Sequence, residues 1–226
     1  MIGAKGIAIL VLLVGCSFLV GQDEAKVQSG PEKGAFLPRA FDCYNVNGPS
    51  KGKPHCLVCS SALYPAVLIF AAEPIEGKDE AFTELLTKLD AMAADFEERN
   101  FLVGVVILSP DARDSTNNAR EEDAAKLIEE AIKREKLIER IRKRAENIKH
   151  IVVGIYPQDG PIVRADPPKG YKLNPKAAIT VLFYERRKII DNYAYAPGTL
   201  DSKDVEMMVK KVRESLSAAK KPAQGK

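Results

Sequence analysis

The sequence lacks the motifs on which most enzymatic chemistry depends. It contains no His-Glu-x-x-His motif, no glycine-rich phosphate-binding loop and no Ser/His/Asp signature. Its only histidines are His55 and His150. Two histidines leave few ligands for a mononuclear metal centre, so we expect no catalytic metal and no cofactor. His150 stands between a predicted helix and a predicted strand, which favours a surface or helix-end role over catalysis.

An excess of charge is also missing. The 226 residues include 34 Lys and Arg against 31 Asp and Glu, which gives a formal net charge of +3. So small an excess is not the electrostatic footprint of a nucleic-acid-binding protein, and we expect no nucleic acid among the partners. The basic residues of 220–226 are typical of a solvated, frayed chain end.

The longest hydrophobic run is too short to cross a membrane. Residues 7–21 read IAILVLLVGCSFLVG, a run of 15, whereas a membrane-spanning helix needs about 20. Preceded by Lys5, this run predicts an export signal over residues 1–21. Two endings remain open: a lipoprotein signal with lipidation at Cys16, or cleavage near Gly21. Both place the protein in the periplasm or cell envelope, and membrane contact would come only through the lipid anchor.

Cysteine is scarce, and its spacing is the main chemical signal. Besides Cys16 the chain has Cys43, Cys56 and Cys59, and disulfides can persist outside the cytoplasm. Two intervening residues allow the sulfurs of a Cys-x-x-Cys pair to meet in a bond that is often reducible. In a redox-active dithiol, Cys56 would be the attacking thiolate because a protonated His55 beside it lowers the pKa of the thiol. Cys59 would then be the resolving thiol.

The same cysteines allow two other interpretations. The pair could be a structural disulfide, either Cys56–Cys59 or one of the two with Cys43. Alternatively they could bind a structural zinc ion with Cys43 and a histidine, although the spacing is irregular and no second Cys-x-x-Cys exists. Covalent haem attachment is excluded because Ser60, not histidine, follows the pair. Cys43 is either a third reactive thiol or a buried apolar residue, and burial is the more typical state.

The pattern of apolar residues predicts one α/β domain. Residues 22–59 form an irregular leader that carries the Cys-x-x-Cys pair and a short strand near 41–46. The domain covers residues 60–217, and 218–226 form a disordered tail. Continuous apolar runs predict buried strands, and apolar residues at helical spacing predict helices with one buried face. We expect strands at 65–72, 101–109 and 150–156, a hairpin at 177–196 turning at Arg186-Arg187, and helices at 79–99, 118–148 and 201–217. Alternating strands and helices imply a mixed sheet with helices on both faces.

This order, together with an exported Cys-x-x-Cys pair, resembles the thioredoxin-like superfamily, in particular its exported bacterial thioredoxin-like and peroxiredoxin-like members. AVLIFAA resembles the first central strand, FLVGVVILSPD the second, and AITVLFYERRKIIDNYAYAPGTL the closing hairpin and the approach to the last helix. The resemblance implies a thioredoxin-like fold and thiol–disulfide exchange with other proteins.

Two features depart from that pattern. In the family, the reactive cysteine follows the first central strand and begins the next helix, where the helix dipole lowers its pKa. The matching segment here, AAEPIEGKDEAF, contains no cysteine. The family's cis-proline would fall at Ala177 or Ala178, and Pro175 is two or three residues early. Two hypotheses therefore stay open: a thiol–disulfide oxidoreductase using Cys56, Cys59 and His55, or a non-catalytic binding module with a structural disulfide.

Overall fold

The computed structural model describes residues 27–73, 80–114 and 124–218. The predicted export signal with Cys16, the first residues of the helix predicted at 118–148 and nearly all of the predicted C-terminal tail lie outside the described residues. So does most of the segment that follows the first central strand.

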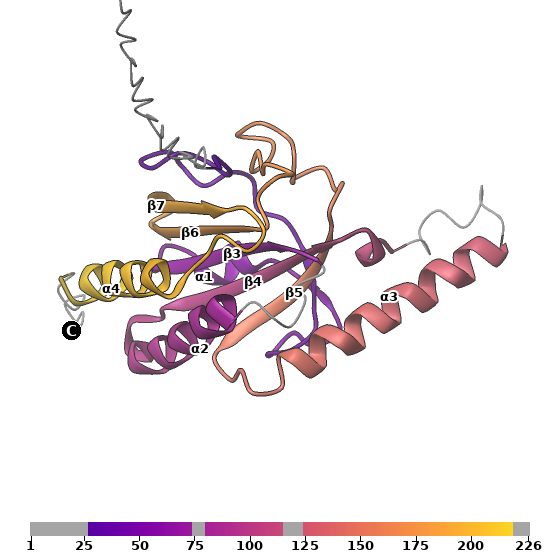
Figure 1. Ribbon diagram of the computed structural model, residues 1–226, viewed down its shortest axis with the longest axis horizontal. Helices are drawn as coiled ribbons and strands as arrows, with labels where there is room; N and C mark the ends of the chain where they lie inside the picture. The colour runs from indigo at the N-terminus through magenta and orange to yellow at the C-terminus, as the bar shows by residue number, and fades with distance from the viewer. Residues whose placement is uncertain (1–26, 74–79, 115–123, 219–226) are drawn as a thin grey trace, which may run out of the picture.

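A single mixed sheet of seven strands organises the described residues, in the order β2-β1-β5-β4-β3-β6-β7 (Figure 1). The three central strands β5, β4 and β3 are parallel, while β6, β7, β1 and β2 are antiparallel to their neighbours. The strands are β1 (Cys43–Asn45), β2 (Pro54–His55), β3 (Ala66–Ala72), β4 (Leu102–Ser109), β5 (Ile151–Pro157), β6 (Ile179–Glu185) and β7 (Lys188–Tyr195).

The central strands are continuous apolar runs because both of their faces are buried. Along β3, side chains alternate between two hydrophobic clusters, as the two-residue period of a strand requires. Val67, Ile69 and Ala71 belong to one cluster. Ala66, Leu68 and Phe70 belong to the other. The strands predicted from sequence are therefore confirmed to within one or two residues at their ends.

Helices cover both faces of the sheet, which confirms the predicted fold class. They are α1 (Leu57–Ser61), α2 (Glu80–Asp95), α3 (Ala124–Arg144) and α4 (Ser202–Ala218). Buried residues of α2, α3 and α4 share one cluster, whereas Leu57 and Val58 of α1 belong to the cluster on the opposite face. We call these the helical face and the α1 face. On the helical face α2 packs against α4 (Figure 1).

The α1 face is closed mainly by irregular chain rather than by long helices. An aromatic group fills it: Phe41 stacks on Phe70 at 5.9 Å between ring centres and meets Tyr156 and Tyr171 edge-on at 5.3 and 5.5 Å. Such aromatic pairs add to the free energy gained by burial. The segment that the sequence presents as a leader is thus packed into the fold: Phe41 lies in this cluster, and β1 pairs with β5.

The hairpin β6–β7 turns where the sequence predicts it. Arg186 and Arg187 have φ values of 50° and 62°, in the left-handed region. A two-residue hairpin turn needs positive φ at both central positions to match the twist of its strands. The turn also touches the α1 region, because the Arg186 N–H donates to the Leu63 carbonyl at 3.1 Å.

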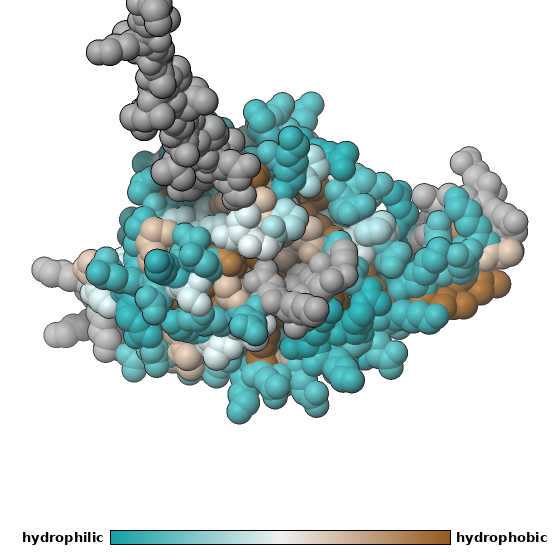
Figure 2. Space-filling view, in the orientation of Figure 1, coloured by the Kyte–Doolittle hydropathy of each residue, from teal (hydrophilic) through white to brown (hydrophobic). Residues whose placement is uncertain are grey.

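Helix α3 differs from its predicted pattern. The sequence indicates one apolar stripe from Ala124 to Ile148, but within the helix only the second half is buried, at Leu137, Ile138 and Ile141. The first half extends beyond the sheet, and Figure 2 shows apolar surface along its outer end. Ile128 and Ile132 are 62% and 50% exposed there. The first half of the helix has no strand beneath it to cover its apolar side chains, so helical spacing alone overstates what is buried.

Candidate functional site

The Cys-x-x-Cys pair forms a disulfide at the start of α1. Cys56 follows directly after β2 and is the N-cap residue of the helix, and the Cys56–Cys59 Cα atoms are 5.2 Å apart. The backbone N–H of Cys59 donates to Cys56 Sγ at 3.0 Å. Sequence reasoning missed this helix because it has only five residues, too few for a helical period to show. The signal that could have found it is the pair itself, since two intervening residues make one helical turn.

The two sulfurs differ in their access to solvent. The Cys56 residue is only 9% exposed and packs in the cluster of the α1 face. Cys59 is exposed. The helical turn thus places the Cys56 residue against the core and leaves the Cys59 residue in contact with solvent.

His55 stabilises the turn through Ser60 rather than through a sulfur. The Ser60 hydroxyl donates to the Cys56 carbonyl at 3.1 Å, so it accepts a hydrogen bond from His55 Nε2 at 2.7 Å. The imidazole therefore joins the residue before the disulfide to the residue after it. The His55 residue is only partly buried.

Cys43 is a buried free thiol beneath the site. It is 1% exposed, and its Sγ lies 3.6 Å from the His55 carbonyl oxygen. Burial raises the pKa of the Cys43 thiol to about 12. A thiol is nucleophilic only when deprotonated, so burial keeps Cys43 unreactive at neutral pH. The expectation that Cys43 is an ordinary buried residue is confirmed.

Glycines in the strands allow this close packing. A Cβ atom at Gly154 would lie 2.6 Å from Cys43 Sγ, and one at Gly104 would lie 2.9 Å from the Leu57 side chain. Glycine inside a strand often marks such an approach by a neighbouring group. Gly154 lets the Cys43 side chain of β1 pack closely against β5, and Gly104 lets α1 pack closely against β4. These two contacts fix the position of the disulfide turn.

The far end of α1 is anchored by a buried hydrogen bond. Ser61 Oγ lies 2.9 Å from the hydroxyl oxygen of Tyr184 in β6, and Ser61 Oγ also donates to the Val58 carbonyl at 2.9 Å. Burial raises the pKa of Tyr184 above its usual value, so the phenol stays protonated. The disulfide turn is therefore held on one side by apolar packing and on the other by a polar contact.

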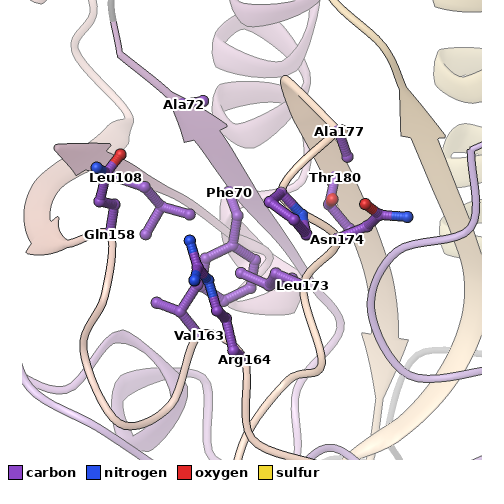
Figure 3. A pocket seen from close by; sticks show the side chains of 11 residues that line it. Phe70, Ala72, Leu108, Gln158, Val163, Arg164, Leu173, Asn174, Ala177 and Thr180 are labelled. Carbon is purple, nitrogen blue, oxygen red and sulfur yellow. The ribbon is translucent and has the colours of Figure 1, made fainter.

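The resemblance to thioredoxin-like enzymes places the reactive cysteine after the carboxyl end of β3, before α2, and not at the start of α1. The carboxyl end of β3 borders a hollow of about 150 Å³, which Figure 3 shows with Phe70, Val163 and Leu173 gathered around it. No cysteine occurs after Cys59 anywhere in the sequence. Among the described residues the only cis peptide bond is Pro167–Pro168, and none occurs at Ala177 or Ala178. The family's usual reactive group is thus not present at this end of the sheet.

Metal binding finds no support in the described part of the chain. Those residues contain no group of three or more His, Cys, Asp and Glu placed to hold a metal ion. The Cys56 and Cys59 sulfurs, which the zinc alternative would use as ligands, are joined to each other. Among the helices that the structure describes, none is long and apolar enough to span a membrane.

Comparison with solved structures identifies the fold. A candidate protein disulfide isomerase from Bacteroides thetaiotaomicron aligns with a TM-score of 0.51 and 15% identity, over 84% of this chain and 95% of that one. An uncharacterized conserved protein from Geobacillus kaustophilus aligns with a TM-score of 0.51 and 15% identity, over 88% and 90%. No family model and no curated protein matches the sequence. Strand order, helix placement and these neighbours together define an α/β protein with the thioredoxin-like fold.

Proposed function

We propose that this protein is an exported thiol–disulfide exchange protein that works through Cys56 and Cys59. The observation that carries the proposal is the asymmetric disulfide: the Cys59 residue is exposed, while the Cys56 residue is buried and its sulfur accepts a backbone N–H. A buried, inert staple needs neither feature. The neighbour described as a candidate disulfide isomerase supports the proposal at the level of fold.

The asymmetry assigns a role to each sulfur. A partner thiolate attacks Cys59 Sγ, a mixed disulfide with Cys59 forms, and the bond between Cys59 and Cys56 breaks. The electron pair passes to Cys56 Sγ, where the Cys59 N–H stabilises the negative charge because hydrogen bonds to charged groups are the stronger ones. A second partner thiolate then attacks the partner sulfur of the mixed disulfide and displaces Cys59. Two thiols become one disulfide, the protein takes up two electrons, and two protons from the partner thiols complete its dithiol.

In the reverse direction the same geometry makes Cys59 the nucleophile. The exposed Cys59 thiolate attacks a partner disulfide, and Cys56 then attacks Cys59 Sγ to release the reduced partner. His55 contributes by fixing the turn through Ser60, so that the two sulfurs stay within bonding reach. The partners are other proteins in the periplasm or cell envelope, reached through the predicted export signal and, in the lipoprotein case, held by an anchor at Cys16.

The decisive experiment measures the two thiols separately. In Cys56→Ser the remaining Cys59 should react with iodoacetamide at least about tenfold faster than Cys56 does in Cys59→Ser, because the buried sulfur is shielded. The Cys43→Ala background removes the third thiol from both measurements. For the intact pair, equilibration with glutathione buffers should give a reduction potential well above the roughly −300 mV of inert structural disulfides.

A second candidate function is a non-catalytic binding module with a structural disulfide. The absence of any cysteine after Cys59 favours it, because the fold's usual reactive position is then empty of thiols. A potential below about −300 mV, or equal alkylation rates for the two cysteines, would establish this module and refute the exchange protein.

A further inference from the structure

A groove on the helical face is unrelated to the disulfide. It lies between α2 and α3, where β5 is visible between the two helices in Figure 1, and its volume is about 390 Å³. Small-molecule sites are typically mostly apolar pockets of about 300–1,000 Å³ with a few polar groups. The groove falls in this range, whereas the hollow at the end of β3 holds only about 150 Å³.

The floor of the groove consists of side chains of β4 and β5, and its walls are the facing sides of α2 and the C-terminal end of α3. The apolar side chains that matter most are Ile107 and Val153 of the floor, Phe82 and Leu86 of α2, and Ile141 and Ile148 on the α3 side. Leu86 and Ile148 are only partly buried. A ligand that covered them would gain the free energy of removing apolar surface from water.

The rim of the groove has a free positive charge. Arg144 lines it and makes no ion pair with any described residue, and it follows Arg142 and Lys143 in the last turn of α3. Asp90 also lines the groove, but its Oδ1 accepts the backbone N–H groups of Lys149, His150 and Ile151 at 3.0, 2.7 and 3.1 Å. One oxygen of the Asp90 carboxylate is therefore held by three backbone N–H groups, which partly offset its negative charge, and the guanidinium of Arg144 is available.

From this combination we infer a binding site for an amphipathic anion, an unbranched alkyl chain with a terminal carboxylate. The chain lies along the apolar floor between α2 and α3, and the carboxylate meets the guanidinium of Arg144. The side-chain amide of Asn147 provides a further polar contact at the mouth. The ligand is recognised by length and charge, and binding needs neither sulfur of the disulfide.

The test is calorimetric titration of the full chain with soluble probes below their micelle concentrations. Hexanoate, octanoate and decanoate should bind with affinity rising roughly fourfold per methylene, the effect of burying each one in an apolar site. Octanoate should bind about tenfold more tightly than octan-1-ol, because hydrogen bonds to charged groups are the stronger ones. Octyltrimethylammonium should bind least.

Two variants localise the site. Arg144→Gln should reduce octanoate affinity about tenfold to the level of octan-1-ol and leave the affinity for octan-1-ol unchanged. The matched control Arg142→Gln, outside the groove, should change neither affinity.

Ala145→Leu places three more carbons in the groove and should abolish binding of every probe. Methyl NMR shifts induced by octanoate should appear at Ile107 and Val153 and not at Leu57 on the α1 face. Thermal unfolding checks that Ala145→Leu is folded, and Thr87→Leu at the mouth serves as a second blocking variant.

Several results would overturn the inference. Absence of saturable binding, equal affinity for octanoate and octan-1-ol, preference for the cationic probe, or binding that survives both blocking variants would each exclude an amphipathic anion in this groove. The Cys56→Ser/Cys59→Ser protein should bind octanoate as the wild type does. This separates the outcome from that of the exchange reaction, since either proposal can fail alone.

Discussion

The two faces of the sheet are built in different ways. The helical face is covered by three long helices whose buried residues recur at helical spacing, such as Phe82, Leu85 and Leu89 of α2. The α1 face is covered by a five-residue helix and by irregular segments around an aromatic group. The first face is regular and holds no cysteine. The second is irregular and holds Cys43 and the disulfide.

This difference separates what stabilises the fold from what can react. On the α1 face, individual contacts hold the disulfide turn in place: Gly104 admits Leu57, Gly154 admits Cys43, and Ser61 meets Tyr184. A reactive sulfur at a defined exposure needs this kind of support, because neighbouring groups must hold it in one geometry.

The largest expected effect tests whether both faces are true cores. Leu89→Ala on the helical face should lower the free energy of unfolding by about 2–5 kcal/mol, the usual loss for a buried leucine. Leu57→Ala on the α1 face should cost a similar amount, because both side chains are 2% exposed. Urea unfolding followed by circular dichroism measures both. A loss below about 0.5 kcal/mol for Leu57→Ala would show that α1 is not anchored to the sheet.

A smaller effect tests the close approach beneath the disulfide. Gly154→Ala should destabilise the protein by about 1–3 kcal/mol, because the new methyl group overlaps Cys43 Sγ. Cys43→Ala should restore most of that loss in the double variant, since it removes the overlapping sulfur. Urea unfolding of the two single variants and the double variant gives the coupling energy. Strictly additive losses would mean that Cys43 and Gly154 are not in contact.

The dependence of the free energy of unfolding on pH above neutrality tests the burial of Cys43. The folded state raises the pKa of this thiol from 9.0 to about 12, so the unfolded chain loses the proton at a lower pH. The stabilising contribution is complete below pH 9 and is lost as the pH rises from 9 to about 12. Near pH 10 the wild type should have lost about 1 kcal/mol more than Cys43→Ala, relative to neutral pH.

Unfolding of the two proteins between pH 7 and pH 10 measures this difference directly, because the buried tyrosines contribute equally to both. Parallel pH profiles would show that Cys43 is accessible to solvent. Reaction of Cys43 with iodoacetamide at neutral pH in the folded state would contradict the same assignment.

The smallest effect concerns the outer half of α3. Ile128→Lys and Ile132→Lys should each change the free energy of unfolding by no more than about 0.5 kcal/mol, as surface substitutions do. Ile138→Ala in the inner half should cost about 2–5 kcal/mol, because this side chain is 1% exposed. Thermal unfolding distinguishes the two. A large loss at Ile128 would mean that its side chain is covered in solution.

Much of the fold could be predicted from the sequence because its signals are local. The apolar run of β3 and the spacing of Phe82, Leu85 and Leu89 report burial along one element, and they predict strand and helix without knowledge of any neighbour. The turn at Arg186 and Arg187 is also predicted from a local pattern, because a strand-like segment lies on each side of it. Helix α3 shows the limit of this reasoning, since an apolar stripe does not reveal where the sheet ends.

The candidate site was predictable only in part. By itself the sequence determined the α/β class, the order of the long strands and helices and the two cysteines able to form the pair, because periodicity and spacing are properties of one stretch of chain. Tertiary structure alone decided that Cys56 is buried and Cys59 exposed, that His55 contacts Ser60, and that Cys43 lies against Gly154. The physical reason is that exposure and contact depend on segments far apart in the chain, such as β1 against β5 and α1 against β4, whose approach no local pattern encodes.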